Sequence, residues 1–192
     1  MRLIVVDVEA TCWRKDPPGA SEIIEIGAVA YEQGSGEIGA FQTFVQPHNQ
    51  PVLSKFCRGL TRIKQADVDT APKFSEALRL FSEWSKRCEP FRLASWGDYD
   101  YRQFIADCAL HAVDYPFETH LNLKRLFARV ERCKPCGMRR ALRMVGLTLK
   151  GAHHRGLDDA RNIVQLLEHL IVAKPGLALE SLDPLRCDLA HR

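Results

Sequence analysis

The sequence predicts an α/β fold with a mixed central sheet of about five strands flanked by helices, and three observations support it. Residues 2–8 (RLIVVDV) form a near-continuous apolar run, which is typical of a buried strand. Residues 22–31 and 39–47 are two further strand candidates, and the turn-forming QGSGE between them favours an antiparallel pair. From residue 53 onward the pattern becomes helical, and one more strand is expected at about 90–97.

The helical part of the chain divides into seven segments by apolar periodicity and end signals. These segments are 53–60, 61–68, 74–88, about 100–112, 119–132, 137–145 and 156–173. The order of three strands, helices, one strand and more helices predicts a single α/β domain over residues 1–175, followed by a C-terminal tail, 176–192.

The composition is that of an ordinary globular domain, with 46% hydrophobic and 27% charged residues. The net charge of +3 weakly suggests a polyanionic partner. The first apolar run is short and ends at Asp7, so we expect neither a secretory signal nor a membrane-spanning segment, and no membrane partner. Seven cysteines at scattered positions do not form a disulfide framework, which predicts a reducing, cytoplasmic location.

Two acidic residues stand at the end of the first predicted strand. Asp7 and Glu9 are two positions apart, so their side chains leave the same face of that strand. Like charges held together beside a buried strand repel, and a hard metal ion with oxygen ligands would neutralise them. The alternative is that the two acids are exposed and simply end an edge strand.

A third acid comes from the last predicted helix, whose periodicity distinguishes two neighbours. Asp158 falls on a polar stripe with Asn162, Gln165 and His169, so we expect it to be solvated. Asp159 aligns with the apolar face and is expected to point toward the protein body. Its alternative role is ordinary helix-start chemistry, since an acid in the first turn is favoured by the helix dipole.

His153 and His154 lie in the loop just before that helix. Either could act as a base near a metal site, because an imidazole titrates close to neutral pH. A loop histidine is also commonly a surface residue.

The segment SWGDYDYRQF follows the fourth predicted strand and contains Asp98 and Asp100. Asp100 precedes a predicted helix with Gln103 three residues later, so it could be an N-cap in a capping box. Its place at the carboxyl end of a strand favours a functional role, because open α/β sheets usually bind ligands there.

In chain order, the segments DVEAT (7–11), WGDYDYRQF (96–104) and HRGLDDARN (154–162) resemble the three acidic motifs of the DEDDh superfamily of 3′–5′ exonucleases. The segment 53–69 (LSKFCRGLTRIKQADVD), with APKF at 71–74, resembles the branch containing the eukaryotic histone-mRNA and small-RNA 3′ exonucleases and a bacterial sporulation-kinase pathway inhibitor. The resemblance covers about residues 2–172.

The resemblance implies an RNase H-like fold and a metal-dependent active site. The implied ligands of two Mg²⁺ or Mn²⁺ ions are Asp7, Glu9, Asp100 and Asp159, and His154 is the implied general base. One ion would activate a water and the other would stabilise the leaving 3′ oxygen. The implied substrate contacts are Ala10, Thr11, Phe56, Leu60, Thr61, Tyr99 and His154.

The implied reaction is removal of nucleoside 5′-monophosphates, one at a time, from a free 3′ end. The implied partner is a single-stranded nucleic acid, because an unstacked terminal base can be gripped between apolar side chains. The branch that the sequence resembles implies RNA as the first choice, and short DNA is the alternative. The candidate phosphate contacts are Arg102, Lys124, Arg125, Arg139 and Arg140.

Two other classes of protein are compatible with parts of the sequence. Cys133 and Cys136 have the CxxC spacing of zinc and redox proteins, although a second ligand pair is not evident. A non-catalytic binding module that kept the exonuclease fold is the other alternative, because fold alone does not establish activity.

Overall fold

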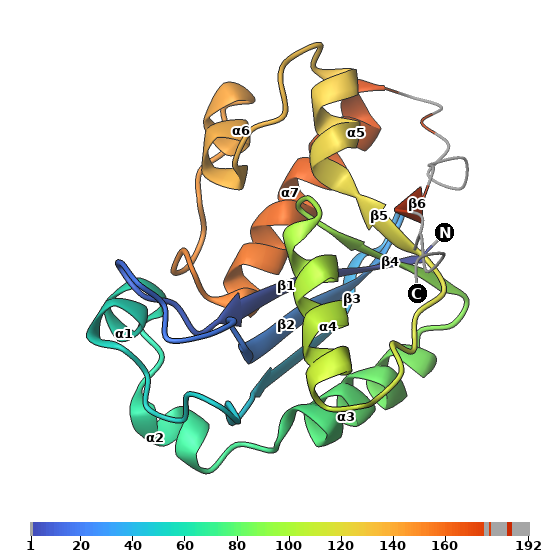
Figure 1. Ribbon diagram of the computed structural model, residues 1–192. Coiled ribbons are helices and arrows are strands. Elements are labelled where there is room, and N and C mark those ends of the chain that lie inside the picture. The colour runs from blue at the N-terminus through green and yellow to red at the C-terminus, as the bar shows by residue number, and fades with distance from the viewer. Residues whose placement is uncertain (1, 175–176, 178–183, 186–192) are drawn as a thin grey trace.

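The structure is a computed structural model that describes residues 2–174, Leu177 and the backbone of Pro184–Leu185. Figure 1 shows a twisted central sheet with helices packed on both of its faces. The strand order is β3-β2-β1-β4-β5-β6, so the first strand of the chain lies in the middle of the sheet. A central strand is buried on both faces, which explains the continuous apolar run at the start of the sequence.

The antiparallel half of the sheet agrees with the sequence prediction. It consists of β1 (Arg2–Ala10), β2 (Ile23–Glu32) and β3 (Gly36–Phe44), and β2 pairs antiparallel with both neighbours. The predicted turn between 31 and 39 joins β2 to β3 as a hairpin. The predicted antiparallel set is therefore confirmed, and with the parallel pairs of β4 the sheet is mixed, as predicted.

The parallel half contains one strand that the sequence prediction missed. β4 (Phe91–Ser95) pairs parallel with β1, and β5 (His120–Asn122) pairs parallel with β4. The helix expected over 119–132 is wrong for its first four residues. The helix begins only after Asn122, whose side chain accepts a hydrogen bond from the Arg125 amide and caps it.

The helices lie close to their predicted positions. They are α1 (Lys55–Thr61), α2 (Gln65–Asp69), α3 (Phe74–Lys86), α4 (Tyr99–Leu110), α5 (Leu123–Val130), α6 (Met138–Met144) and α7 (Gly156–Ala173). No helix among the described residues is both long and apolar enough to cross a membrane.

The start of α4 excludes one of the two alternatives for Asp100. Asp98 occupies the N-cap position and Asp100 lies inside the first turn, so Asp100 is not a helix cap. Gln103 does not close a capping box, because its amide donates to the Ser21 carbonyl and to Asp107. The side chain of Asp100 is thereby left for another role.

Alternating residues of β1 build two separate cores. Leu3 and Val5 pack with α5, α6 and α7, whereas Ile4 and Val6 pack with α3 and α4 on the opposite face. Asp7 and Glu9 continue the register of Leu3 and Val5. The two acids therefore leave the sheet on the face covered by α7.

The sheet gains a short sixth strand, β6 (Pro184–Leu185), which pairs antiparallel with β5. Apart from this backbone and Leu177, the predicted tail 176–192 lies outside the described residues.

Candidate active site

A cavity of about 800 Å³ opens where β1 ends and α7 begins. Its walls come from β1, α1, the start of α4, α6, the loop before α7 and the first turn of α7. Figure 1 shows where these elements lie in the fold. All five residues predicted to be catalytic line this cavity: Asp7, Glu9, Asp100, His154 and Asp159. Segments far apart in the sequence are thus brought to one place.

The carboxylates converge tightly. Asp7, Glu9 and Asp159 each offer an oxygen atom, and these atoms all lie within 4.8 Å of one another. Asp100 is fixed beside them because its Oδ1 accepts a 3.0 Å hydrogen bond from the Val8 amide. This bond ties the first turn of α4 to the strand that carries the other two acids.

Burial raises the pKa of all four carboxyl groups, and repulsion by neighbouring carboxylates raises it further for Asp7 and Glu9. Burial and the charges of Asp159 and Glu25 raise the pKa of Glu9 to about 8. Burial raises the pKa of Asp100 to about 6, although the hydrogen bond from Val8 opposes this. The pKa of Asp7 is raised by burial and by the charge of Asp100. Such a cluster ionises fully at neutral pH only when cations neutralise it.

The donor set fits hard divalent cations. Four carboxylates supply only oxygen ligands, which suit Mg²⁺ and Mn²⁺. A second candidate group for a metal consists of His153, His154 and Asp159. Because Asp159 belongs to both groups, its position decides which side chains can reach a bound ion.

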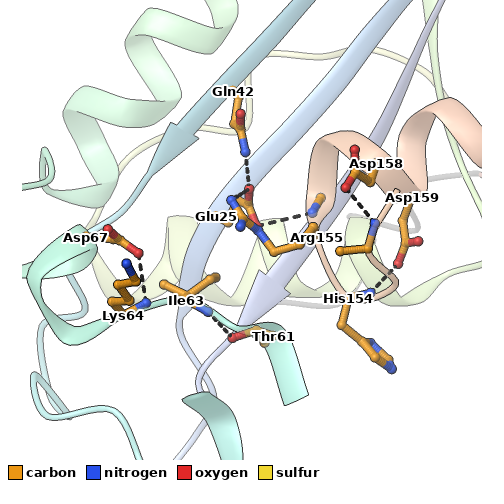
Figure 2. A network of polar contacts seen from close by, with 12 residues as sticks. Glu25, Gln42, Thr61, Ile63, Lys64, Asp67, His154, Arg155, Asp158 and Asp159 are labelled. Carbon is orange, nitrogen blue, oxygen red and sulfur yellow. Dashed lines mark hydrogen bonds and ion pairs between the residues drawn. The ribbon is translucent and has the colours of Figure 1, made fainter. Parts of the chain in front are cut away.

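Asp159 is held from two directions, and Figure 2 shows the contact with the histidine loop. Its Oδ2 accepts a 2.9 Å hydrogen bond from the His154 backbone amide. The Nδ1 atom of His153 lies 2.9 Å from the same oxygen. Burial raises the pKa of the Asp159 carboxyl, against the effect of these contacts. The prediction that Asp159 points inward is confirmed, since it is 4% exposed.

The two histidines have different surroundings. The ring of His153 contacts Asp159, whereas the ring of His154 stacks on that of His153 with centroids 3.9 Å apart. In the described part of the chain, no hydrogen bond joins the His154 ring to another side chain. Burial and the neighbouring His153 lower the pKa of His154, which keeps its imidazole neutral and able to accept a proton.

Asp158 differs from its prediction as a solvated residue. It is partly buried, and its side chain accepts a 2.8 Å hydrogen bond from the Ala152 amide. Asn162, placed on the same polar stripe, is fully buried and bonds to the backbone of Lys150. Both residues close the loop before α7, so the polar stripe faces protein there rather than solvent.

A buried ion pair that sequence reasoning missed positions the histidine loop. Glu25 on β2 is 0% exposed and accepts hydrogen bonds from Arg155, the Gly156 amide and Gln42 (Figure 2). Gly27 allows this approach, because a Cβ atom there would lie 2.0 Å from the backbone nitrogen at the start of α7. Arg155 follows His154 directly, so the pair fixes the backbone that carries the histidine.

The predicted substrate contacts fall into two groups. Ala10, Leu60, Tyr99 and His154 line the cavity. Thr11, Phe56 and Thr61 are not among its lining residues.

The hydroxyls of Thr11 and Thr61 already have protein partners. Thr11 accepts from the Glu22 amide, and Thr61 donates to the Cys57 carbonyl. Phe56 is 41% exposed on α1. A role in substrate binding stays a prediction for all three predicted residues outside the cavity.

The CxxC cysteines show no metal-site geometry in the described part of the chain. Neither Cys133 nor Cys136 belongs to a candidate metal group there. The sulfur of Cys136 instead lies 4.0 Å from that of Met144.

The comparisons with known proteins agree with this geometry. The exonuclease family model (RNase_T) matches residues 4–167. The chain belongs to this exonuclease family. The DEDDh resemblance read from the three acidic motifs is thereby confirmed.

Individual exonuclease relatives cover most of the chain. "ERI1 exoribonuclease 2" of Danio rerio is 31% identical over 202 aligned positions, which cover 93% of this chain and 36% of that protein. "3′-5′ exonuclease Snipper" of Drosophila melanogaster is 31% identical over 189 positions, covering 86% and 67%. The chain spans only about a third of the vertebrate ERI1 exoribonuclease 2 relatives.

A solved exonuclease structure has the same fold. The nuclease domain of 3′hExo, described as a DEDDh family member bound to rAMP, superposes with a TM-score of 0.87 at 27% identity, covering 96% of both chains. The predicted DEDDh nuclease fold is therefore confirmed.

Proposed function

We propose that this chain is a metal-dependent 3′–5′ exonuclease that removes nucleoside 5′-monophosphates from single-stranded RNA. The observation that carries the proposal is the convergence of Asp7, Glu9 and Asp159 within 4.8 Å in a cavity of a chain that belongs to the exonuclease family. The exonuclease domain would comprise residues 1–175. The free cysteines among the described residues support a reducing, cytoplasmic location.

The four carboxylates Asp7, Glu9, Asp100 and Asp159 would hold two Mg²⁺ or Mn²⁺ ions. When bound, such ions supply charge that activates a water and stabilises the leaving 3′ oxygen. The hydrogen bond between Asp100 and the Val8 amide keeps the second acidic motif in register with the first.

His154 would accept the proton of the attacking water at a ring nitrogen. Its lowered pKa supports this role, because a base must be unprotonated at the pH of the reaction. His153 would position Asp159 through its Nδ1 contact rather than act as the base. The buried pair of Glu25 and Arg155 would hold the histidine loop in place.

The terminal nucleoside would pack against Ala10, Leu60 and Tyr99 on one side of the cavity. Aromatic side chains stack on bases of any sequence, which suits an exonuclease. RNA is the proposed substrate because relatives carry the name exoribonuclease and a similar structure holds rAMP.

Digestion of a 5′-labelled single-stranded RNA with and without Mn²⁺ tests the proposal. A ladder shortened from the 3′ end is expected with Mn²⁺, and Asp7→Asn should abolish it. Asp158→Asn is the matched control, because it lies outside the cavity lining and retains an acceptor for the Ala152 amide. If wild type cleaves neither RNA nor DNA, the chain is a binding module instead.

The histidine assignment has its own test. His154→Ala should lose the limb of the pH–rate profile that reports the base, whereas His153→Ala should lower the rate without removing that limb. Equal changes in both profiles would contradict the assignment.

A further inference from the structure

Helix α6 contributes a basic wall to the cavity. Arg139, Arg140 and Arg143 all line it and are exposed to solvent. Between Glu131 and Asp158 the chain contains no acidic residue. The positive charge of this segment therefore has no local counterpart in the sequence.

The arrangement on α6 differs from that of a solvated helix in the same protein. On α3, Arg79 lies between Glu76 and Glu83 and pairs with both. No described residue forms an ion pair with the three arginines of α6.

The spacing on α6 also works against helix stability. Arg139 and Arg143 are four positions apart, and like charges at this spacing destabilise a helix. Arg143 lies in the last turn, where the helix dipole favours a cation, but this does not account for Arg139 and Arg140.

The acids and the arginines face the same cavity from different elements. Arg139 and His154 both line this cavity. Ala10, Leu60 and Tyr99 form an apolar part of the lining that suits a nucleoside rather than a phosphate. The lining therefore combines apolar side chains, carboxylates and arginines, which suit a nucleoside, divalent cations and phosphates respectively.

We infer that Arg139, Arg140 and Arg143 bind the phosphates on the 5′ side of the scissile bond, so that the strand leaves the site across α6. This inference rests on the proposed function. Arginine forms charge-assisted, bidentate hydrogen bonds with phosphate, and exposed side chains of one helix can follow a flexible backbone.

The same reasoning reduces the number of candidate phosphate contacts predicted from the sequence. Arg102 and Arg125 both approach Asp98, at 3.8 and 3.5 Å. Their charge is therefore partly neutralised within the protein. Arg139 and Arg140 have no such partner in the described part of the chain, and Arg143 joins them one turn later.

A triple variant, Arg139→Ala/Arg140→Ala/Arg143→Ala, tests the inference with two substrates. A single-stranded RNA of several nucleotides has upstream phosphates, whereas a nitrophenyl ester of a nucleoside 5′-monophosphate has none. We expect KM for the RNA to rise on the order of tenfold with kcat retained. Hydrolysis of the ester should be unchanged.

A binding measurement gives a readout independent of activity. Fluorescence anisotropy of labelled RNA in chelator, at several salt concentrations, should show weaker binding by the variant. The slope of log affinity against log salt should decrease by about 2, because each phosphate contact to a single strand contributes about 0.7. The control variant, Lys86→Ala/Arg87→Ala/Arg129→Ala, removes the same charge from exposed positions outside the cavity lining and should keep the wild-type slope.

The outcomes separate the inference from the proposed function. If the α6 variant and the control lose affinity equally, or if ester hydrolysis falls with RNA cleavage, the inference is overturned. If wild type cleaves neither substrate, the proposed function fails, and the salt slopes still decide whether α6 binds phosphates.

Discussion

Buried acids in this protein are of two kinds, and they differ in where their partners come from. Glu25 is 0% exposed and is matched by Arg155, Gln42 and a backbone amide. Glu22 is 1% exposed and accepts hydrogen bonds from the amides of three consecutive residues, 48–50. Both carboxylates therefore find their hydrogen-bond donors within the fold itself.

The cavity acids are matched less completely. Asp100 and Asp159 accept hydrogen bonds from backbone amides, but among the described residues no ion pair is formed by Asp7 or Glu9. Glu9 and Asp159 are 8% and 4% exposed, yet their carboxylates lie close to that of Asp7. Their raised pKa values record this mismatch. The comparison teaches that Glu22 and Glu25 stabilise the fold, whereas the cavity acids lower its stability unless cations are bound to them.

The largest expected effect is on catalysis. Asp7→Asn should lower the rate of RNA cleavage about 10³-fold, since several kcal/mol of charge stabilisation is lost. In chelator the same variant should unfold at the same or a higher temperature, because one repulsive charge is gone. Cleavage assays measure the expected loss of rate, and thermal melts measure the unfolding temperature. A variant that is both inactive and unstable would place Asp7 with the structural acids.

The next effect concerns the structural acids. Glu25→Gln should lower the free energy of unfolding by about 3 kcal/mol, because it leaves Arg155 without its buried partner while that side chain keeps some contact with water. Urea denaturation measures this.

The exposed pair of Glu37 and Arg161 provides the matched control. Glu37→Gln should change the free energy of unfolding by about 0.5 kcal/mol or less, as for other surface pairs. Equal effects of the two substitutions would mean that burial does not distinguish these ion pairs.

The comparison between the two kinds of acid can in part be anticipated from the sequence. The acids Asp7, Glu9, Asp100 and Asp159 were identified because short motifs and the two-residue period of β1 place them together. Glu25 was missed, since its partner Arg155 lies 130 positions away and no local pattern connects them. A long-range pair of this kind can be recognised only once the packing of α7 against the sheet is known.

Local ambiguity explains the other errors. The strand β5 has only three residues, too few for periodicity to distinguish it from the start of the helix that follows. Asp158 and Asn162 look solvated on a helical projection but are covered by the loop before α7. The roles of His153 and His154 depend on loop geometry, with His154 in a left-handed conformation at φ 63°.

The smallest expected effect is a pH dependence of stability in chelator. Glu9, with its pKa raised from 4.5 to about 8, binds a proton more tightly in the folded chain. Stability should therefore fall as pH rises through this range, by up to about 1.4 kcal/mol per pH unit. His120 has the opposite effect on the pH dependence of stability. Burial lowers its pKa from 6.5 to about 4, so its contribution is lost as pH falls below 6.5.

The effect of Glu9 is consequently clearest between about pH 7 and pH 8, where His120 no longer titrates in either state. Urea denaturation at several pH values should show a smaller slope for Glu9→Gln than for wild type. An identical slope in both proteins would contradict the assigned cause.

The most direct test of the central claim is calorimetric titration of Mn²⁺ into the purified, chelator-treated protein, with wild type compared with Asp7→Asn and Glu25→Gln. The cavity acids should bind two ions per chain in wild type and in folded Glu25→Gln, with proton release, and binding should be lost or strongly weakened in Asp7→Asn. Failure of wild type to bind Mn²⁺, or equal binding by wild type and Asp7→Asn, would contradict the account.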